Sequence, residues 1–206
     1  MRRRLQHVSA TILKLDRLKA MMGLAVAIGV IGRICTFAGE PLWFDETFTG
    51  VIATQPNFAS FYEWISFEIG GPIYYSLLWL WQSVAGNSNN ALRLPSLVFS
   101  LLTIVVAIRA TEISDRTRLV YVALTALTTA SYLQANEARS YALIALVCSL
   151  QLLAFIRLLR NPVTANAVLW VAISTITILI HYHAGFISLM QGLIYLAYCK
   201  RHAVKT

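Results

Sequence analysis

Residues 141–156 read YALIALVCSLQLLAFI, a run that contains no charged side chain and is followed directly by Arg157. Its length approaches the roughly 20 apolar residues that an α-helix needs to cross the hydrocarbon core of a bilayer. The rest of the chain has the same character, since 58% of the 206 residues are hydrophobic, 13% are charged and the mean hydropathy is +0.65. This composition indicates an integral membrane protein and excludes an ordinary soluble domain.

Further apolar stretches of comparable length occur along the chain. We expect each to be helical, because lipid offers backbone polar groups no partner except one another. The sequence therefore predicts an all-α integral membrane protein with about six transmembrane helices, in a single membrane domain that covers residues 1–206. Besides 141–156, the predicted spans are 21–38, 91–108, 119–135, 167–180 and 184–199.

A seventh apolar stretch, PIYYSLLWLWQSVA at 72–85, is too short to span. At about 1.5 Å per residue it covers some two-thirds of a 30 Å hydrocarbon core. If this stretch lies in the interface, every Lys and Arg except Arg33, Arg93 and Arg139 falls on one side, which the positive-inside rule identifies as the cytoplasm. We therefore expect a multi-pass protein with a basic cytoplasmic N-terminus, residues 1–20, and no nucleic-acid partner.

Residues 39–90 form the longest predicted connection and lie on the outer side. Loops of this length are usually functional or disordered, and the many aromatic residues here argue against disorder. We expect short amphipathic helices at the membrane surface, with Trp and Tyr at the depth of the headgroups. This loop contains PLWFDETFT at 41–49, where two carboxylates follow two aromatic residues.

Ionisable side chains recur at the outer ends of the predicted spans. An intramembrane Arg costs about 2.5–3.5 kcal/mol on insertion scales, so each is a functional hypothesis. The set suits a lipid-phosphate substrate, because Arg offers a planar fork to phosphate oxygens and a carboxylate can accept a hydroxyl proton. The candidate site residues are Asp45, Glu46, Arg33, Arg93, Glu137, Arg139, Tyr74, Tyr75, His181 and His183.

Simpler interpretations of these residues stay open. Each Arg could extend to the headgroups or pair with an acid to join helices, and Tyr74 and Tyr75 could be interfacial anchors. Asp45 and Glu46 are adjacent and cannot point the same way, so we expect one to react and the other to orient or support it.

The sequence contains no recognisable metal-binding pattern. His181 and His183 are two residues apart, unlike the i, i+4 pair of zinc helices, so we expect polar contacts to substrate or to Glu137 instead. The three cysteines lie inside apolar runs, where Cys behaves as a small hydrophobic residue. We expect no metal, no cofactor and no disulfide.

Several motifs in the same order resemble the GT-C glycosyltransferases. The specific resemblance is to the family 39-like membrane enzymes related to protein O-mannosyltransferases and to the lipid A aminoarabinose transferase. After Arg33, it follows the motifs LWFDETFT at 42–49, PIYYSLLWLW at 72–81, ALRLPSLVFSLLT at 91–103, NEARSYALIAL at 136–146 and IHYHAGF at 180–186.

The resemblance implies transfer of a sugar from a polyprenyl-phosphate donor to a lipid, polysaccharide or protein acceptor, on the outer face of a bacterial plasma membrane. It implies that Asp45 is the general base, that Glu46 is its neighbour in the site, and that Arg93 and Arg139 bind the donor phosphate. Relatives commonly have His-Pro-Pro where this chain has Gly70-Gly71-Pro72. They are also about twice as long, so the resemblance implies the N-terminal part of a longer module, with a second chain as one source of further helices.

Two other function classes remain as alternatives. The chain could be a non-catalytic partner subunit, or a truncated remnant, that keeps the site residues. It could also be a transporter in which Asp45, Glu137 and the histidines relay protons. The ionisable residues cluster at one predicted surface, whereas transporter sites lie near the bilayer midplane, which disfavours the transporter.

Overall fold

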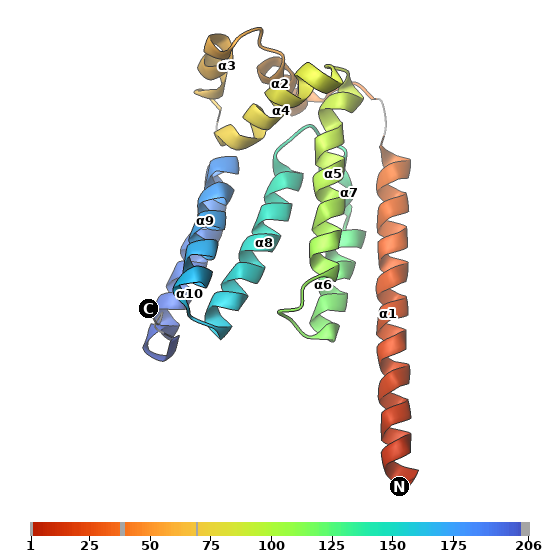
Figure 1. Cartoon of the computed structure of the whole chain (residues 1–206). Helices are drawn as coiled ribbons and strands as arrows, with labels where there is room; N and C mark the ends of the chain where they lie inside the picture. Colours follow the sequence, from red (N-terminus) through yellow and green to blue (C-terminus); the bar gives the residue numbers. More distant parts are fainter. Residues whose placement is uncertain (1, 38–39, 69, 203–206) are drawn as a thin grey trace.

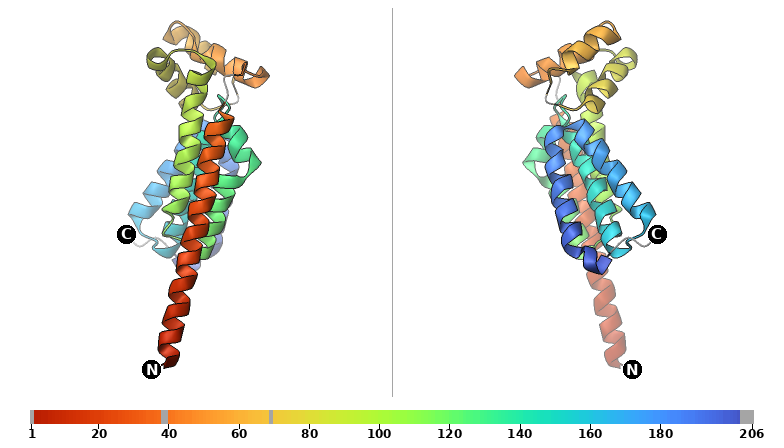
Figure 2. Two further views of the ribbon diagram at one scale, coloured as in Figure 1. Left: turned by 90° about the vertical axis from the view of Figure 1, so that its right-hand side faces the viewer. Right: turned by 90° about the vertical axis from the view of Figure 1, so that its left-hand side faces the viewer.

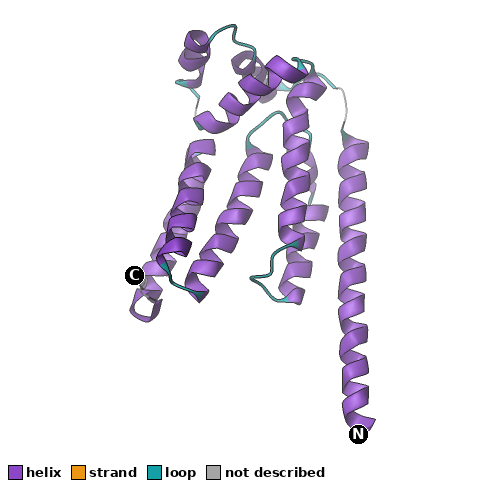
Figure 3. Ribbon diagram, in the orientation of Figure 1, coloured by secondary structure: helices purple, strands orange, loops and turns teal. Residues whose placement is uncertain are grey.

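The computed structural model describes residues 2–37, 40–68 and 70–202, and side chains between residues 16 and 198 of these ranges. The described residues are helical throughout, apart from connecting loops and one isolated β-bridge (Figure 3). The prediction of an all-α protein is therefore confirmed.

Most of the helices form a bundle, and three others form a cap at one end of it (Figure 1). Both side views show the cap beyond that same end (Figure 2). The cap consists of α2 (Phe44–Ala53), α3 (Phe58–Ile65) and α4 (Pro72–Ala85). The bundle consists of α1 (Arg2–Thr36), α5 (Asn89–Ile108), α6 (Asp115–Leu127), α7 (Thr129–Ala135), α8 (Tyr141–Arg160), α9 (Thr164–Ile180), the 3₁₀ turn η1 (Tyr182–Ala184) and α10 (Gly185–His202).

Among the residues that the structure describes, three helical segments are long and apolar enough to cross a membrane: Asp16–Thr36, Asn89–Ile108 and Tyr141–Arg160. Helix α9 is apolar but shorter. These segments support the prediction that the chain is a membrane protein. The short helix predicted at 72–85 coincides with α4, and the predicted loop at 39–90 contains the whole cap.

The prediction of one continuous helix at 119–135 was wrong. The chain forms α6 and then α7, separated by Thr128, whose backbone is extended at φ −73° and ψ 141°. The Thr128 carbonyl accepts from Ser131 N at 3.0 Å, and its hydroxyl lies 2.8 Å from Ser131 Oγ. Local hydrogen bonds of hydroxyl side chains compete with helix continuation in this way.

The cap is attached to the bundle at the end of α9. Gly71 N donates to Ile180 O at 2.9 Å, and Gly70 forms an antiparallel bridge with His181. A β-carbon on Gly71 would lie 1.9 Å from Leu179 O, so no larger residue fits without a shift of the backbone. Within the cap, Phe61 of α3 stacks on Trp79 of α4, with 5.0 Å between the ring centroids. Both rings belong to an apolar core.

We predict that Gly71→Ala destabilises the protein, because its methyl group must displace the backbone of α9. Overpacking of this kind costs about 1–3 kcal/mol. Gly23→Ala is the matched control, since no atom lies within 4 Å of a β-carbon at that position. Thermal unfolding in detergent measures both, and equal melting temperatures would contradict this account of the cap contact.

Candidate functional site

Glu46 lies fully buried in the first turn of α2, where four hydrogen bonds hold its carboxylate. Arg93 of α5 donates through Nε to Oε1 at 2.8 Å and through Nη2 to Oε2 at 2.5 Å. The backbone N–H of Ala138 donates to Oε1 at 2.6 Å, and that of Trp43 to Oε2 at 3.2 Å. A buried carboxylate requires such partners, because an uncompensated buried charge is strongly destabilising.

These hydrogen bonds also determine the protonation of Glu46. Burial favours the neutral acid, but the bonds from Arg93, Ala138 and Trp43 outweigh it, and the pKa of Glu46 lies below its usual value. Arg93 is held equally firmly, since Nη1 donates to Glu40 O at 2.8 Å and Nη2 to Pro41 O at 3.1 Å. The pair therefore fastens α2 to α5 and to the turn between α7 and α8.

Asp45, one residue earlier, has different surroundings. Its side chain is half-buried, and its carboxylate forms no ion pair or hydrogen bond with any side chain or backbone group between residues 16 and 198 that the structure describes. Its backbone carbonyl accepts from Arg139 Nη1 at 3.2 Å. Among the described residues, the Asp45 carboxylate is thus unpaired, and a guanidinium group contacts the backbone of the same residue.

Arg139 is held more loosely than Arg93. Besides the Asp45 carbonyl, Nη1 lies 3.4 Å from Thr49 Oγ1 and 3.7 Å from Glu68 Oε1. Its guanidinium carbon lies 5.8 Å from the centre of the Tyr141 ring. Charge-assisted hydrogen bonds are usually about 2.7–2.9 Å long, so these contacts leave the guanidinium able to take a better anionic partner.

Aromatic and imidazole side chains surround Arg139. Burial raises the pKa of Tyr75 to about 12, which keeps its hydroxyl protonated. The Tyr141 and His181 rings lie 6.5 Å apart, and Nδ1 of His181 lies 3.4 Å from Nδ1 of His183. Burial, and then the charges of His183 and Arg139, lower the pKa of His181, which favours neutral imidazole. We call Asp45, Glu68, Tyr75, Arg139, Tyr141 and His181 the Arg139 cluster.

Glu137 lies elsewhere, on a polar cavity of about 280 Å³. Burial, and then the nearby charges of Glu46 and Asp45, raise the pKa of Glu137 despite the opposing effect of Arg139. Glu137 therefore binds a proton more readily than an ordinary glutamate. Residues of the first helix, the cap, α5 and the α7 region line the cavity: Thr36, Glu40, Pro41, Trp43, Glu46, Arg93, Tyr132, Leu133, Asn136 and Glu137.

Two other residues in the predicted site are part of the packed interior. Arg33 is fully buried and donates to Ser100 Oγ at 2.7 Å, Thr125 O at 2.7 Å and Ala126 O at 2.8 Å. The two carbonyl groups belong to the last turn of α6, where the break at Thr128 leaves them without helical partners. Arg33 therefore stabilises that break. Tyr74 lies buried in the apolar core that the cap shares with α5, α8 and α9.

Three residues near Arg139 were not among the predicted site residues: Thr49, Tyr141 and Glu68. Thr49 belongs to the quoted motif and follows Asp45 by one helical turn, while Tyr141 follows Arg139 by two residues. These spacings are the signals in the sequence that could have identified Thr49 and Tyr141 as site residues. Helical spacing alone is not enough, because it does not distinguish Thr49 from any other residue four positions after a candidate. Glu68 has no such signal, because the fold of the α3–α4 connection brings it to Arg139.

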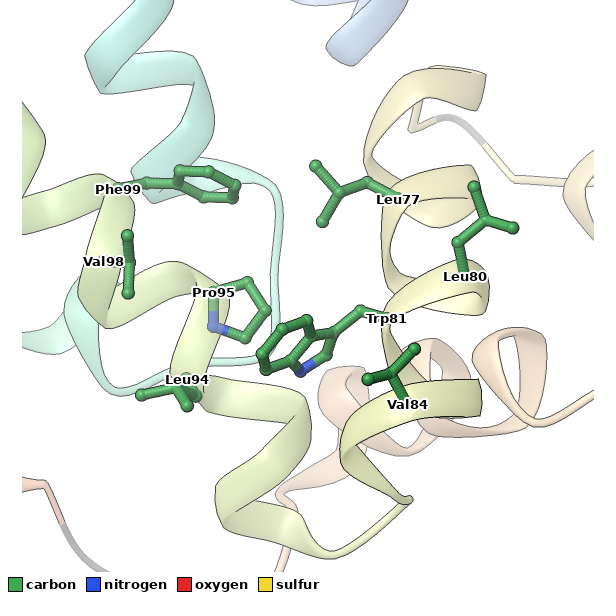
Figure 4. Close-up of a pocket in the computed structure, with 8 residues that line it drawn as sticks. All are labelled: Leu77, Leu80, Trp81, Val84, Leu94, Pro95, Val98 and Phe99. Carbon is green, nitrogen blue, oxygen red and sulfur yellow. The ribbon is translucent and has the colours of Figure 1, made fainter.

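An apolar groove of about 520 Å³ lies where α4 and α5 diverge from their connecting turn (Figure 4). The Trp81 ring and Pro95 face each other across it in the view of Figure 4. Pro95 precedes Ser96, whose hydroxyl donates to the Arg139 carbonyl at 3.3 Å. Leu77, Leu80, Trp81, Val84, Leu94, Pro95, Val98 and Phe99 line the groove.

Among the described residues, no group of three His, Cys, Asp or Glu side chains is placed to hold a metal ion. Cys35 and Cys148 are free thiols. Cys199 lies outside the residues whose side chains the structure describes.

We predict that Glu46→Gln destabilises the protein by about 3–5 kcal/mol at neutral pH, because it leaves Arg93 buried without its counter-ion. The folded-state pKa of Glu46 lies below 4.5, so the ion pair stabilises fully above that pH. The stabilisation is lost as the pH falls through the folded-state pKa. The stability difference between wild type and variant should therefore shrink on acidification.

Melting temperatures in detergent, recorded between pH 7 and the lowest pH at which the protein stays soluble, measure this difference. Glu40→Gln is the control, because Glu40 is exposed and its hydrogen bond with Arg93 is made by the backbone carbonyl, which the substitution keeps. A Glu46→Gln variant as stable as Glu40→Gln at neutral pH would contradict the role assigned to the pair.

No protein family model, curated protein or solved structure matches this chain.

Proposed function

We propose that the protein is a membrane glycosyltransferase that moves a sugar from a polyprenyl-phosphate donor to an acceptor on the outer face of the membrane. The observation that supports this best is the unpaired carboxylate of Asp45, with Arg139 Nη1 3.2 Å from its backbone carbonyl. A general base and a phosphate-binding cation must lie close together in such a site, because the acceptor oxygen attacks the carbon that bears the phosphate.

Asp45 is a better candidate for the base than Glu46. Four hydrogen bonds occupy the Glu46 oxygens, and its lowered pKa makes it a weaker proton acceptor. Removal of Glu46 from Arg93 would also leave both charges buried without a partner. In this proposal Glu46 supports the site, and Asp45 contacts the acceptor hydroxyl.

Arg139 is a better candidate for the donor phosphate than Arg93. All three nitrogens of the Arg93 guanidinium already donate to oxygens of Glu40, Pro41 and Glu46. Arg139 has long contacts, and Arg binds phosphate well because its planar fork presents two donors at once. Tyr75 and His181 of the Arg139 cluster, with His183 beside His181, are the proposed polar contacts to the donor.

The proposed reaction is a single displacement. The acceptor hydroxyl oxygen forms a bond to the anomeric carbon while the bond from that carbon to the phosphate oxygen breaks. The hydroxyl proton passes to Asp45, polyprenyl phosphate leaves with the bonding electron pair, and Arg139 stabilises the negative charge that develops on it. Attack opposite to the leaving group inverts the anomeric carbon.

The groove between α4 and α5 is the proposed site of the polyprenyl tail. Its lining is apolar, and Pro95 in its wall is the chain neighbour of Ser96, which is hydrogen-bonded to Arg139. In this proposal, a lipid in the groove has its phosphate end near the Arg139 cluster.

In this proposal six helical segments cross a bacterial plasma membrane, and the N-terminus lies in the cytoplasm. The six are α1, α5, α6 together with α7, α8, α9 and α10. The cap then lies in the outer interface, where aromatic side chains are favoured. Phe58, Tyr62 and Phe67 support this position, since they are 64%, 63% and 83% exposed in a part of the chain rich in aromatic residues.

We predict that Asp45→Asn lowers sugar transfer by about 10²- to 10⁴-fold, the usual contribution of a positioned general base. Transfer is measured with the purified chain in lipid nanodiscs, from polyprenyl phosphates that bear radiolabelled hexose or pentose to added lipid, polysaccharide and protein acceptors. Glu63→Gln is the control, since Glu63 is an exposed acid on α3 and should leave the rate unchanged. Equal rates for Asp45→Asn and wild type would contradict the assignment of the base, and no transfer by folded wild type would contradict the proposed activity of this chain.

A further inference from the structure

Glu68 lies where a phosphate group would meet Arg139. Its Oε1 is 3.7 Å from Arg139 Nη1, and the two side chains are 22% and 16% exposed, respectively. The hydrogen bonds of Arg139 Nη1 go to neutral oxygens of Asp45 and Thr49. Among the described residues, Glu68 is therefore the carboxylate that pairs with this guanidinium.

The backbone holds Glu68 in this place from both sides. Its N–H donates to Ile65 O at 3.2 Å, at the end of α3. Two residues later, Gly70 forms its bridge with His181, and Gly71 N donates to Ile180 O. Gly71 also fits tightly against Leu179, so described residues on both sides of Glu68 in the chain are fixed by backbone contacts.

The contact between Glu68 and Arg139 is suited to exchange. A 3.7 Å separation is longer than an ordinary charge-assisted hydrogen bond, and partly exposed ion pairs are weak. A phosphate group can make two short hydrogen bonds to the same guanidinium. Glu68 and a bound phosphate would repel each other, so the stronger anion should displace the weaker one.

We infer that Glu68 is an internal occupant of the anion-binding site at Arg139, that the phosphate of the lipid donor displaces it, and that it thereby sets the affinity for that phosphate. This inference rests on the proposed function, and it assigns to Glu68 a role in specificity that the sequence motifs did not suggest. When the reaction ends, the return of Glu68 to Arg139 offsets the loss of contacts to the departing polyprenyl phosphate. The same carboxylate therefore weakens donor binding and favours product release.

The test compares binding of farnesyl phosphate, farnesol and inorganic phosphate to the full chain in detergent, by isothermal titration calorimetry. The first compound combines the lipid tail with the phosphate, and the other two supply each part alone. Glu68→Gln should bind farnesyl phosphate about 3- to 10-fold more tightly than wild type, since it removes the competing charge and keeps the shape. Its affinity for farnesol should equal that of wild type.

Three further variants complete the comparison. Glu63→Gln makes the same change of charge at an exposed position of α3, and it should bind farnesyl phosphate as wild type does. Glu68→Asp keeps the competing charge and should stay close to wild type. Arg139→Gln should lose the preference for farnesyl phosphate over farnesol.

The outcomes separate this inference from the proposed function. Equal affinities of Glu68→Gln and wild type for farnesyl phosphate would overturn the role of Glu68 and leave the donor site intact. The same would follow if Glu63→Gln tightened binding as much as Glu68→Gln. Inorganic phosphate could also bind as tightly as farnesyl phosphate and respond in the same way to Glu68→Gln. That result would keep the anion-binding site but assign it to a free phosphate. No binding of farnesyl phosphate by any folded variant would overturn the donor site and Glu68's role together.

Discussion

The ion pair between Glu46 and Arg93 determines where the polar side chains at the cap end of the bundle lie. Both charges are removed from water, and their attraction compensates for this only because other groups complete the hydrogen bonding. Trp43 N and Ala138 N complete the shell of the carboxylate, and the carbonyls of Glu40 and Pro41 complete that of the guanidinium. Three parts of the chain that are far apart in sequence are thereby fixed to one another.

This pair positions its covalent neighbours as well as its own atoms. Asp45 precedes Glu46, and Arg139 follows Ala138, whose N–H donates to the Glu46 carboxylate at 2.6 Å. The distance between the candidate base and the candidate phosphate ligand is thus set through short, rigid connections. A buried carboxylate with no reactive role of its own can determine the geometry of a site in this way. Once its position is fixed, Asp45 and Arg139 can move only by rotation about their own backbone and side-chain bonds.

Parts of this arrangement are predictable from sequence because they depend on local pattern. The apolar run at 72–85 begins with Pro after two glycines, and α4 begins at Pro72, since Pro is favoured in the first turn of a helix. The break at Thr128 is harder to predict, because 119–135 contains no charged residue and Thr residues do not by themselves stop a helix. What permits the break is Arg33 of α1, which supplies donors to the freed carbonyls of Thr125 and Ala126 from a distant part of the sequence.

The same reasoning explains why three arginines with one sequence signature differ in their surroundings. Arg33, Arg93 and Arg139 all lie near the ends of apolar runs, and composition cannot separate them. Their differences arise from which oxygens the fold presents. Arg33 meets carbonyls of a broken helix, and Arg93 meets a buried carboxylate. Arg139 meets neutral oxygens at 3.2 and 3.4 Å and a partly exposed carboxylate at 3.7 Å. An arginine whose donors are satisfied by short bonds in the interior must lose them to bind a ligand, and that loss is costly. Arg139 loses little, so it is the arginine of the three at which an anionic ligand can bind without disrupting the fold.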